Sequence, residues 1–504
     1  MRKLLKSCLL IFVAICVSLS FVGCKKKVSP TSASIENIKD SNGQTTNGGM
    51  TLVYGDYLYF INGTKDNDGK SQKNNTRSSI CRVKYNMTTG ETVGDIEVVV
   101  DELVGFADGS IHIFGDYLYY TTPSDGENSK GEILYNKTAF KRYDLVNNKS
   151  YTLYTTALNS ADEVMNFAYY VVGDTLNLLV YEKTNATINS LKIDKKVTVN
   201  YTINKVASCL FSENYGKVIT TGAEVDANSF VYYTQAPDLY ESPQTGVKIY
   251  KTSPVENNST LISKGRDISL VTIRSGKLIY SCNSYIYAQM ITAKADETLV
   301  TDNSNCISHA SLDNAIYLEN YSLIDDPQNA GKKQLVKSEG SIAILSLTKA
   351  TDSAFYFNIF EWTESSNSFK DNYAEIAVLK SAKDFSFIGL ANVTETEKNE
   401  DSDTEESKEV LYAVFMESNI VYKIKIAEVV DANTMKVSEY STKIQLSKTA
   451  VNKNEGLLIP EIIGNYLFIL SEDADKNDYL VKIDVTPKKD VTDEAGKFAL
   501  EEKK

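Results

Sequence analysis

The chain contains two imidazole groups, His112 and His309, which are its candidates for acid–base catalysis or zinc binding. His112 alternates with Ile111 and Ile113, which is typical of a strand residue. Neither histidine accompanies a serine or cysteine in a nucleophile elbow, and the chain has no phosphate-binding glycine loop. We therefore predict no catalytic residue, no cofactor-binding residue and no cofactor.

Acidic and amide side chains gather near the C-terminus at Asp473, Asp475, Asn477 and Asp478, with Asp484 further on. Their spacing is that of a twelve-residue calcium loop. However, Asp478 replaces the glycine that such a loop needs at its sixth position, and Asp484 replaces the usual glutamate at the twelfth. Turns rich in Asp and Asn also form without an ion. We predict no metal ligand, and calcium near Asp473 and Asp475 stays an open alternative.

One further thiol could undergo covalent chemistry. Residues 1–23 combine a basic head, an apolar run and a small residue, which is the pattern of a secretory signal. Cys24 follows directly after Phe21-Val22-Gly23. This segment resembles a bacterial lipoprotein signal with its lipobox, although leucine is usual where Phe21 stands. The resemblance implies cleavage before Cys24 and lipidation of its thiol by acyl chains such as palmitate.

The lipid anchor defines the expected location. Residues 24–50 are rich in Ser, Thr, Asn and Gly, which indicates a flexible tether behind the lipidated cysteine. Two acyl chains are enough for stable attachment. We predict a protein attached to the cell membrane on its extracytoplasmic face. Since residues 1–23 carry three basic groups, their removal changes the net charge from −13 to −16, and this acidity argues against a nucleic-acid partner.

A short phrase recurs along the rest of the chain. It reads YGDYLYFIN at 54–62, FGDYLYYTT at 114–122 and IGNYLFILS at 463–471, with weaker copies between them. The copies are separated by about 51 residues on average, which is typical of a repeated sheet such as a β-propeller blade. Aligned on the second aromatic position, the copies are anchored at Tyr59, Tyr119, Asn177, Tyr232, Tyr280, Tyr317, Tyr356, Tyr412 and Phe468.

Each part of the phrase predicts a local structure. Gly-Asp or Gly-Asn favours a tight turn, because glycine accepts a positive φ. The strand that follows, as in 57–60, is apolar on both faces and is therefore expected between two neighbouring sheets. A second strand alternating apolar and basic residues follows, as in ICRVKY from 80, and then a third. We assign the strand before the next phrase, such as SIHIF from 110, as the fourth of the same blade.

The phrase resembles the tyrosine-rich β-propellers of bacterial surface proteins, which are distantly similar to the propellers of low-density lipoprotein receptors. The resemblance covers residues 51–487 and implies a fold rather than a task. We predict an all-β protein with a single β-propeller of eight four-stranded blades, with seven or nine as alternatives. Strands from the two ends are expected to close the ring, because closure removes exposed sheet edges.

Two charged segments interrupt or follow this domain. Residues 395–409 carry eight acids and two lysines with no apolar side chain, which predicts a disordered acidic loop. An attraction for cations or for a basic partner is the alternative interpretation. Residues 488–504 are charged and are predicted to be a frayed tail.

The remaining cysteines and aromatic residues favour structural roles. Cys81 lies in a strand-like run and is expected in the core, while Cys282 and Cys306 are either free or paired with each other. Most of the 32 tyrosines are expected to pack between blades, whereas Tyr240 and Tyr321 are candidates for an interface. Trp362, the single tryptophan, is interpreted as a strand residue.

These observations predict a binding or scaffold module for an extracytoplasmic protein or glycan, with catalysis less favoured. The alternative is a propeller glycoside hydrolase or lyase that acts on envelope or host glycans, which requires convergent acids, arginines or histidines. A third interpretation is an accessory to a transport or envelope machine. The sequence does not identify the partner or the rim of the propeller that binds it.

Overall fold

The structure is a computed structural model. It describes residues 50–63, 77–87, 89–104, 111–123, 138–155, 167–172, 175–182, 187–193, 204–208, 218–220, 231–235, 247–252, 259–265, 269–274, 277–282, 285–290, 306–308, 316–351, 354–363, 368–379, 385–398, 405–448, 451, 460–472 and 478–500. Among these residues the regular structure consists of antiparallel β-strands, with one short parallel pair. Cys24, His309, Tyr240, Asp473 and Asp475 lie outside the described residues.

Six separate sheets each contain four strands in chain order. We refer to them as blades 1 to 5 and blade 8. Blade 1 consists of β1 (Thr51–Tyr54), β2 (Tyr57–Ile61), β3 (Ile80–Tyr85) and β4 (Thr92–Val100), and blade 2 of β5 (His112–Phe114), β6 (Tyr117–Pro123), β7 (Thr138–Asp144) and β8 (Lys149–Thr155). Blade 3 consists of β9 (Phe167–Val172), β10 (Thr175–Glu182), β11 (Thr187–Ile193) and β12 (Asn204–Ser208), and blade 4 of β13 (Val218–Thr220), β14 (Val231–Gln235), β15 (Val247–Thr252) and β16 (Ser259–Gly265). Blade 5 consists of β17 (Ser269–Arg274), β18 (Lys277–Cys282), β19 (Tyr285–Met290) and β20 (Cys306–Ser308), and blade 8 of β31 (Glu461–Ile463), β32 (Tyr466–Glu472), β33 (Asp478–Asp484) and β34 (Gly496–Lys497).

The seventh sheet has ten strands and contains two four-stranded meanders, which we call blades 6 and 7. Blade 6 is β21 (Ile316–Asp325), β22 (Lys333–Thr351), β23 (Ala354–Thr363) and β24 (Ser368–Leu379); blade 7 is β25 (Phe385–Lys398), β26 (Glu405–Glu417), β27 (Ile420–Asp431) and β28 (Thr434–Val437), followed by β29 (Tyr440–Ser441) and β30 (Ile444–Gln445). The described strands therefore form eight four-stranded units.

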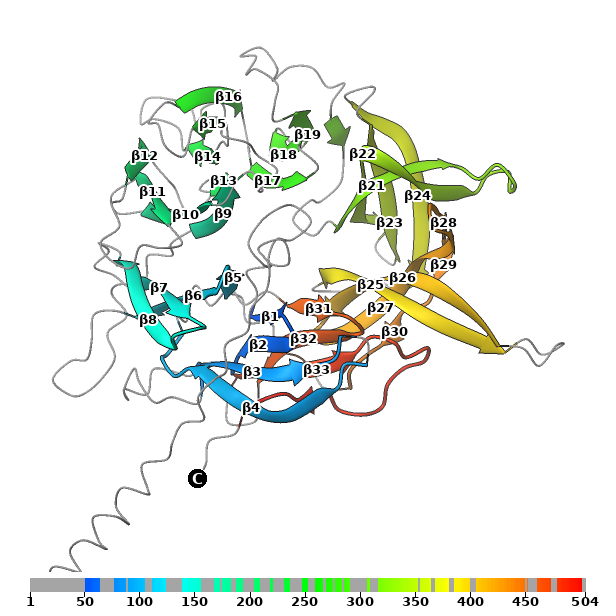
Figure 1. Ribbon diagram of the computed structural model, residues 1–504. Helices are drawn as coiled ribbons and strands as arrows, with labels where there is room; N and C mark the ends of the chain where they lie inside the picture. Colours follow the sequence, from blue (N-terminus) through cyan, green and yellow to red (C-terminus); the bar gives the residue numbers. More distant parts are fainter. Residues whose placement is uncertain are drawn as a thin grey trace, which may run out of the picture.

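The units follow one another around a ring in chain order, and blade 8 lies beside blade 1 (Figure 1). The first strands of neighbouring blades contact each other, as β9 and β13, β25 and β31, and β31 and β1 do. The chain is thus an all-β propeller. Each sheet is built from one continuous segment, so the ends meet blade against blade, and the expected joining of both ends in one sheet is wrong.

The Gly-Asp and Gly-Asn pairs form two-residue hairpin loops between the first two strands of a blade. Gly55, Gly115 and Gly464 have φ angles of 60°, 62° and 59°, the region that glycine adopts without a Cβ clash. The register across one of these loops pairs Phe114 with Tyr117, which joins β5 to β6. The strand before each phrase is therefore the first strand of that blade, and our assignment of SIHIF as a fourth strand is wrong.

The hydrophobic core lies between blades. One cluster joins blades 1, 2, 3 and 8, a second joins blades 6 and 7, and a third joins blades 7 and 8. Leu58, Tyr59 and Phe60 are each 0% exposed, which confirms that the phrase strand is covered on both faces. Cys81 is buried in the same core, as predicted. No helix of the described residues has the length and apolarity needed to cross a membrane.

The middle phrases differ from the expected pattern in blade 6. Tyr317 lies on β21 and Tyr356 on β23, so two of the nine phrases belong to one blade. This explains the short spacing between them.

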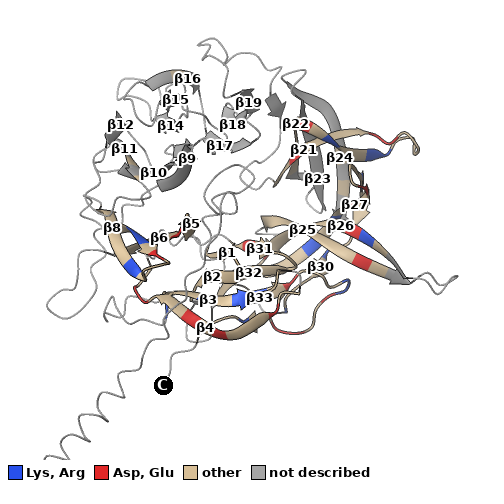
Figure 2. Cartoon of the chain, in the orientation of Figure 1, with Lys and Arg blue, Asp and Glu red and all other residues tan. Residues whose placement is uncertain are grey.

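The acidic segment 395–409 is largely ordered, contrary to the predicted loop. Residues 395–398 and 405–409 extend the β25–β26 hairpin, in which Glu395 is opposite Lys408. Opposite charges across a strand pair stabilise it. The Lys488 ammonium also donates a hydrogen bond to the Thr396 carbonyl at 2.7 Å. The β25–β26 hairpin carries both acidic and basic residues (Figure 2).

The predicted tail, residues 488–504, also contributes to the fold. Strand β34 pairs with β33, and the Phe498 ring packs against Phe60 and Phe468 at centroid distances of 4.9 and 5.4 Å. Asn62 and Leu500 exchange two hydrogen bonds, both of 2.9 Å. The propeller therefore extends to residue 500 instead of ending at 487, because two apolar side chains of this charged segment, Phe498 and Leu500, pack partly buried against the core.

Candidate functional site

Residues 434–441 connect blade 7 to blade 6, and we call them the bridging segment. Within it, β28 pairs with both β27 and β22, and β29 runs parallel to β24. Backbone bonds fix both ends of β28: Lys337 N–H donates to the Asn433 carbonyl, and Ser438 N–H donates to the Ile426 carbonyl, each at 2.8 Å. The segment is thus held rigidly between two blades.

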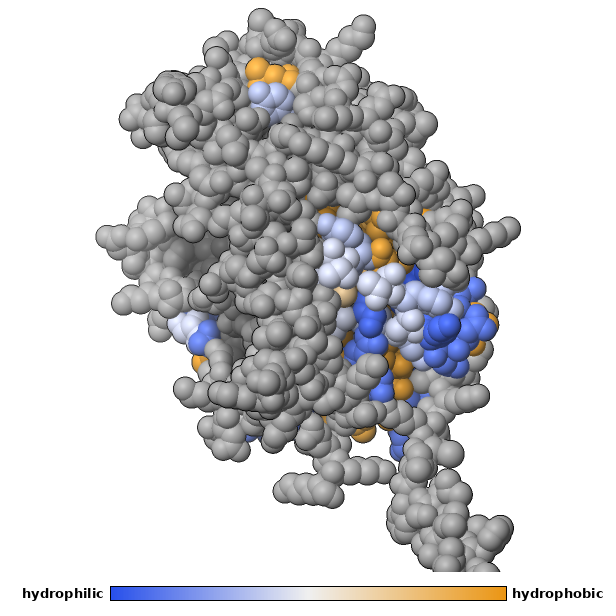
Figure 3. All heavy atoms as spheres, turned by 90° about the vertical axis from the view of Figure 1, so that its left-hand side faces the viewer, coloured by the Kyte–Doolittle hydropathy of each residue, from blue (hydrophilic) through white to orange (hydrophobic). Residues whose placement is uncertain are grey.

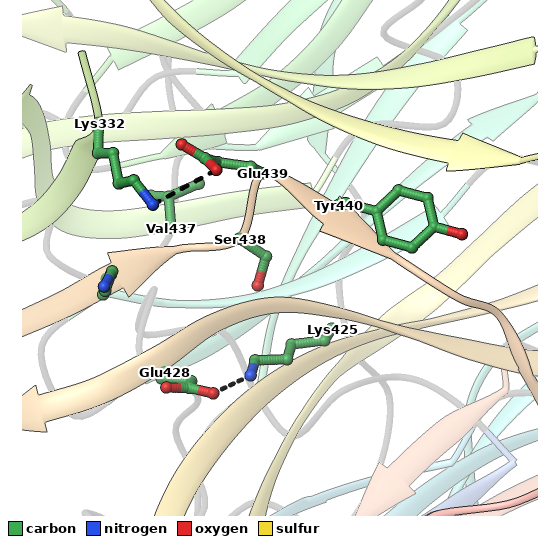
Figure 4. Close-up of a pocket in the computed structure, with 8 residues that line it drawn as sticks. Lys332, Lys425, Glu428, Val437, Ser438, Glu439 and Tyr440 are labelled. Atoms are coloured by element: carbon green, nitrogen blue, oxygen red, sulfur yellow. Dashed lines mark hydrogen bonds and ion pairs between the residues drawn. The ribbon is translucent and has the colours of Figure 1, made fainter.

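A groove of about 350 Å³ lies along the bridging segment, and we call it the bridge groove (Figure 4). Its lining comes from three separate parts of the chain: the end of the β21–β22 loop, strand β27 and the bridging segment. The lining residues are Lys332, Lys425, Glu428, Lys436, Val437, Ser438, Glu439 and Tyr440.

Three lysines give the bridge groove its cationic character. Lys332 forms a 3.5 Å ion pair with Glu439, but these side chains are 40% and 64% exposed, so the pair is weak. Lys425 forms an ion pair with Glu428, which Lys408 also contacts at 3.4 Å. Lys436 has no ion pair with any residue that the structure describes. Its charge does contribute, after hydrogen bonds from Asn329 and Gln328, to the lowered pKa of Asp326.

Ser438 and Tyr440 add groups of another kind. The Ser438 Oγ is buried and has no hydrogen-bond partner among the described residues. In Figure 4 this hydroxyl lies between the Lys332–Glu439 pair and the Lys425–Glu428 pair. The Tyr440 ring lies to one side and is 51% exposed, one of the few exposed large apolar side chains of the described residues. A buried polar group without a partner is rare in proteins and marks a place where a ligand or water can bind.

This arrangement suits binding better than covalent chemistry. A serine nucleophile needs a general base within hydrogen-bond reach, and the Ser438 Oγ has none among the described residues. Glu428 and Glu439, the carboxylates of the groove, are each held by a lysine. The groove offers ammonium groups, a hydroxyl and an aromatic ring to a polar ligand.

The rest of the described surface supports a polar mode of contact. In the coloured part of the face drawn in Figure 3, hydrophilic areas lie beside small separate hydrophobic ones. The exposed large apolar side chains are scattered over several blades: Met87, Val93, Val146, Ile324, Val430 and Tyr440. Scattered apolar residues of this kind do not form an apolar docking patch.

A second polar cluster is buried between blades 7 and 8. Lys423 is 0% exposed, and its ammonium donates to the Val485 carbonyl at 2.8 Å and lies 3.9 Å from the Tyr412 ring centroid. The Tyr412 hydroxyl donates to Glu395 Oε1 at 2.5 Å. Burial lowers the pKa of Lys423 to about 8, against the opposing charges of Glu395 and Asp484. Because solvent does not reach Lys423, this cluster has a structural role.

Some of the 32 tyrosines take part in a contact that recurs inside blades. Tyr59 and Tyr119 are buried, as predicted for the anchors. The first tyrosine of the phrase carries a cation from the third strand over its ring. The pairs are Arg82 over Tyr57 at 4.1 Å, Arg142 over Tyr117 at 4.3 Å and Lys482 over Tyr466 at 4.0 Å. Such contacts stabilise a fold by about 0.5–2 kcal/mol each, and more when buried.

The structure places the other candidates in strands. His112 is a buried residue of β5 and Trp362 lies in β23, which agrees with their interpretation as strand residues. Cys282 and Cys306 belong to one sheet but are separated by β19. Two strand spacings put their Cα atoms about 10 Å apart, beyond the reach of a disulfide. Tyr321 lies on β21 rather than in a loop and packs, partly buried, against the core of blades 6 and 7.

The calcium alternative loses one of its ligands, because Asp478 and Asp484 cannot both belong to the site. Asp478 and Asp484 occupy opposite ends of β33, so their backbones are about 20 Å apart and cannot share one ion. Among the described residues, no group of three or more His, Cys, Asp or Glu side chains has the spacing of a metal site.

The bridge groove itself was not predicted. Lys425 appears in the sequence only as one of the basic residues that alternate along a strand, and Lys436 and Ser438 belong to no motif. These three residues are brought together by the β27–β28 hairpin, and the pairing of β28 with β22 adds Lys332, about 100 residues away in the sequence.

No family model and no curated protein sequence matches this chain. Among solved structures, the WD40 domain of SCAP from fission yeast is 10% identical and covers 87% of this chain and 96% of its own, with a TM-score of 0.39. The Nup133 β-propeller of Vanderwaltozyma polyspora is 11% identical and covers 74% and 98%, with a TM-score of 0.26. An α-L-arabinofuranosidase from Fusarium graminearum is 8% identical and covers 73% and 89%, with a TM-score of 0.24. These values carry no information about function.

Proposed function

We propose that this chain is a membrane-anchored extracytoplasmic lipoprotein whose propeller is a binding module, and that the bridge groove is where it binds a protein or glycan partner. The observation that carries the proposal is the unused binding capacity of the groove. Lys436 has no described ion-pair partner, and the buried Ser438 Oγ has no described hydrogen-bond partner. A partner with an anionic group can form an ion pair with Lys436, and a hydrogen-bonding group of the partner can bind the Ser438 hydroxyl.

The anchor is proposed from the sequence. The basic head, apolar run and Gly23-Cys24 junction support lipidation of Cys24, and residues 25–49 are long enough to hold the ring away from the membrane surface. A ring on such a tether keeps its groove accessible to large partners in the surrounding medium. A hydrolase or lyase is less favoured, because Glu428 and Glu439 are each paired with a lysine and do not flank an open cleft as two catalytic carboxylates do.

The experiment is a capture from cell envelope and growth medium with three immobilised chains: the wild type, Lys436→Glu and Lys84→Glu. Lys84 is an exposed lysine on β3 of blade 1, so its substitution changes the net charge equally but leaves the groove intact. We expect the same captured material on the wild type and on Lys84→Glu, and its loss on Lys436→Glu. Equal capture by all three chains would remove the bridge groove as the binding site.

A further inference from the structure

We infer that the bridge groove takes an acidic glycan, with a sugar carboxylate bound between Lys436 and Lys332. This inference rests on the proposed function and specifies its ligand. The chain has a formal net charge of −13, so a groove with three ammonium groups is a local exception. Lys436 is available as it stands, and Lys332 is available because its ion pair with Glu439 is exposed and therefore weak.

The two glutamates of the groove determine at which end of it a ligand carboxylate binds. Lys425 is held by Glu428, which Lys408 contacts as well, so this part of the groove is already neutralised. The positive charge that remains is at Lys436 and Lys332, on the side of the blade 6 loop. A ligand carboxylate that reaches this side replaces Glu439 at Lys332 and adds a direct ion pair at Lys436, which otherwise interacts with the Asp326 carboxylate.

The size and lining of the groove favour a sugar over a peptide. Its volume of about 350 Å³ is at the lower end of the range for ligand sites and is suitable for a few sugar units. Peptides usually bind through a free strand edge or through apolar anchors. Here β28 has both edges paired, and the apolar lining is limited to Val437 and the Tyr440 ring.

The neutral groups of the groove match the rest of a sugar acid. Rotation of the Ser438 side chain about χ1 would turn its hydroxyl, whose Oγ is buried in this structure, toward a ring hydroxyl of the ligand. The exposed face of Tyr440 can cover the apolar face of a sugar ring, as aromatic rings at interfaces cover partly apolar ligands. One ligand class thus accounts together for Lys436, which has no ion pair among the described residues, for the Ser438 hydroxyl, which has no hydrogen-bond partner among them, and for the exposed Tyr440 ring.

The test is calorimetric titration of the purified chain with trigalacturonate, with maltotriose as the neutral control and poly-L-glutamate as the acidic peptide. We expect trigalacturonate to bind and maltotriose to bind at least tenfold more weakly, with the affinity for trigalacturonate falling as salt is raised. Lys436→Glu should weaken binding at least tenfold and Ser438→Ala several-fold, whereas Lys84→Glu should retain the wild-type affinity. Thermal unfolding of each variant verifies that it is folded.

Three results would overturn the inference. Equal binding of maltotriose would remove the carboxylate from recognition, and unchanged binding by Lys436→Glu would place the ligand elsewhere. Tighter binding of poly-L-glutamate than of trigalacturonate would identify an acidic peptide as the ligand class. If trigalacturonate does not bind while the capture experiment still depends on Lys436, the acidic glycan is wrong and the proposed function stands. If neither responds to Lys436, both fail.

Discussion

The buried Lys423 makes the stability of the propeller depend on alkaline pH. Burial lowers the pKa of this ammonium from 10.5 to about 8 in the folded chain. Between these two values the unfolded chain binds more protons than the folded chain, so the free energy of unfolding rises with pH. The effect begins near the folded pKa, as the buried charge is neutralised, and is complete above 10.5.

The magnitude follows from the same two values. At about 1.4 kcal/mol per pH unit, the full contribution of Lys423 is roughly 3 kcal/mol, of which about 2 kcal/mol has developed by pH 9.5. Substitution of Lys423 by Met removes this contribution. It also leaves the Val485 carbonyl without its 2.8 Å donor, which costs about 1–3 kcal/mol at every pH.

The measurement is urea unfolding of the wild type and Lys423→Met at pH 7, 8, 9 and 9.5. The difference in free energy of unfolding between the two chains should grow by about 2 kcal/mol from pH 7 to pH 9.5 in favour of the wild type. Lys84→Met is the matched control, because Lys84 also lies on the third strand of its blade but is exposed. A difference for Lys423→Met that stays within about 0.5 kcal/mol over this range, like that of the control, would refute the reasoning.

Three further predictions concern the anchor and the ring. Cys24→Ala should move the chain from the membrane fraction to the soluble fraction and abolish palmitate labelling; retention in the membrane would contradict lipidation. Gly464→Ala should destabilise the ring by more than about 3 kcal/mol in urea unfolding, because φ is +59° and the new Cβ would lie 2.2 Å from the Met87 carbonyl oxygen. Gly115→Ala, with φ of +62° and nothing within 4 Å, should cost only about 1 kcal/mol, and equal losses would disprove the close approach. Phe498→Ala should lower the free energy of unfolding by about 2–3 kcal/mol, and an unchanged urea midpoint would show that the C-terminal segment does not contribute to closure.

Features that depend on neighbouring residues could be predicted from the sequence. The glycine turn at Gly55 and the two-sided burial of Leu58 and Tyr59 follow from local turn chemistry and strand alternation. The blade to which a strand belongs was harder to predict, because a hairpin loop and a connection between blades are both short and polar. The register across Gly115 decides this point in the structure.

Features that depend on distant residues could not be predicted. Composition describes residues 488–504 as charged, yet Phe498 packs, partly buried, against Phe60 and Phe468. In the acidic segment, Glu395 is 8% exposed because Tyr412 donates to it and Lys408 lies opposite. The bridge groove is the extreme case, since it is assembled across two blades.

The meeting of blades 1 and 8 has a consequence for how the chain is made. Asn62 and Leu500 are 438 positions apart, so this contact can form only after the chain has been synthesised as far as Leu500. At roughly 5–20 residues per second, this takes about 20–90 s after blade 1 has emerged. During that interval Phe60 and the outer turn at Thr89 and Gly90 lack the partners that blade 8 supplies through Phe498, Tyr466 and Lys482. A chain that is truncated before blade 8 would keep this aromatic surface exposed to solvent, so the exposure of this surface distinguishes chains with blade 8 from chains without it.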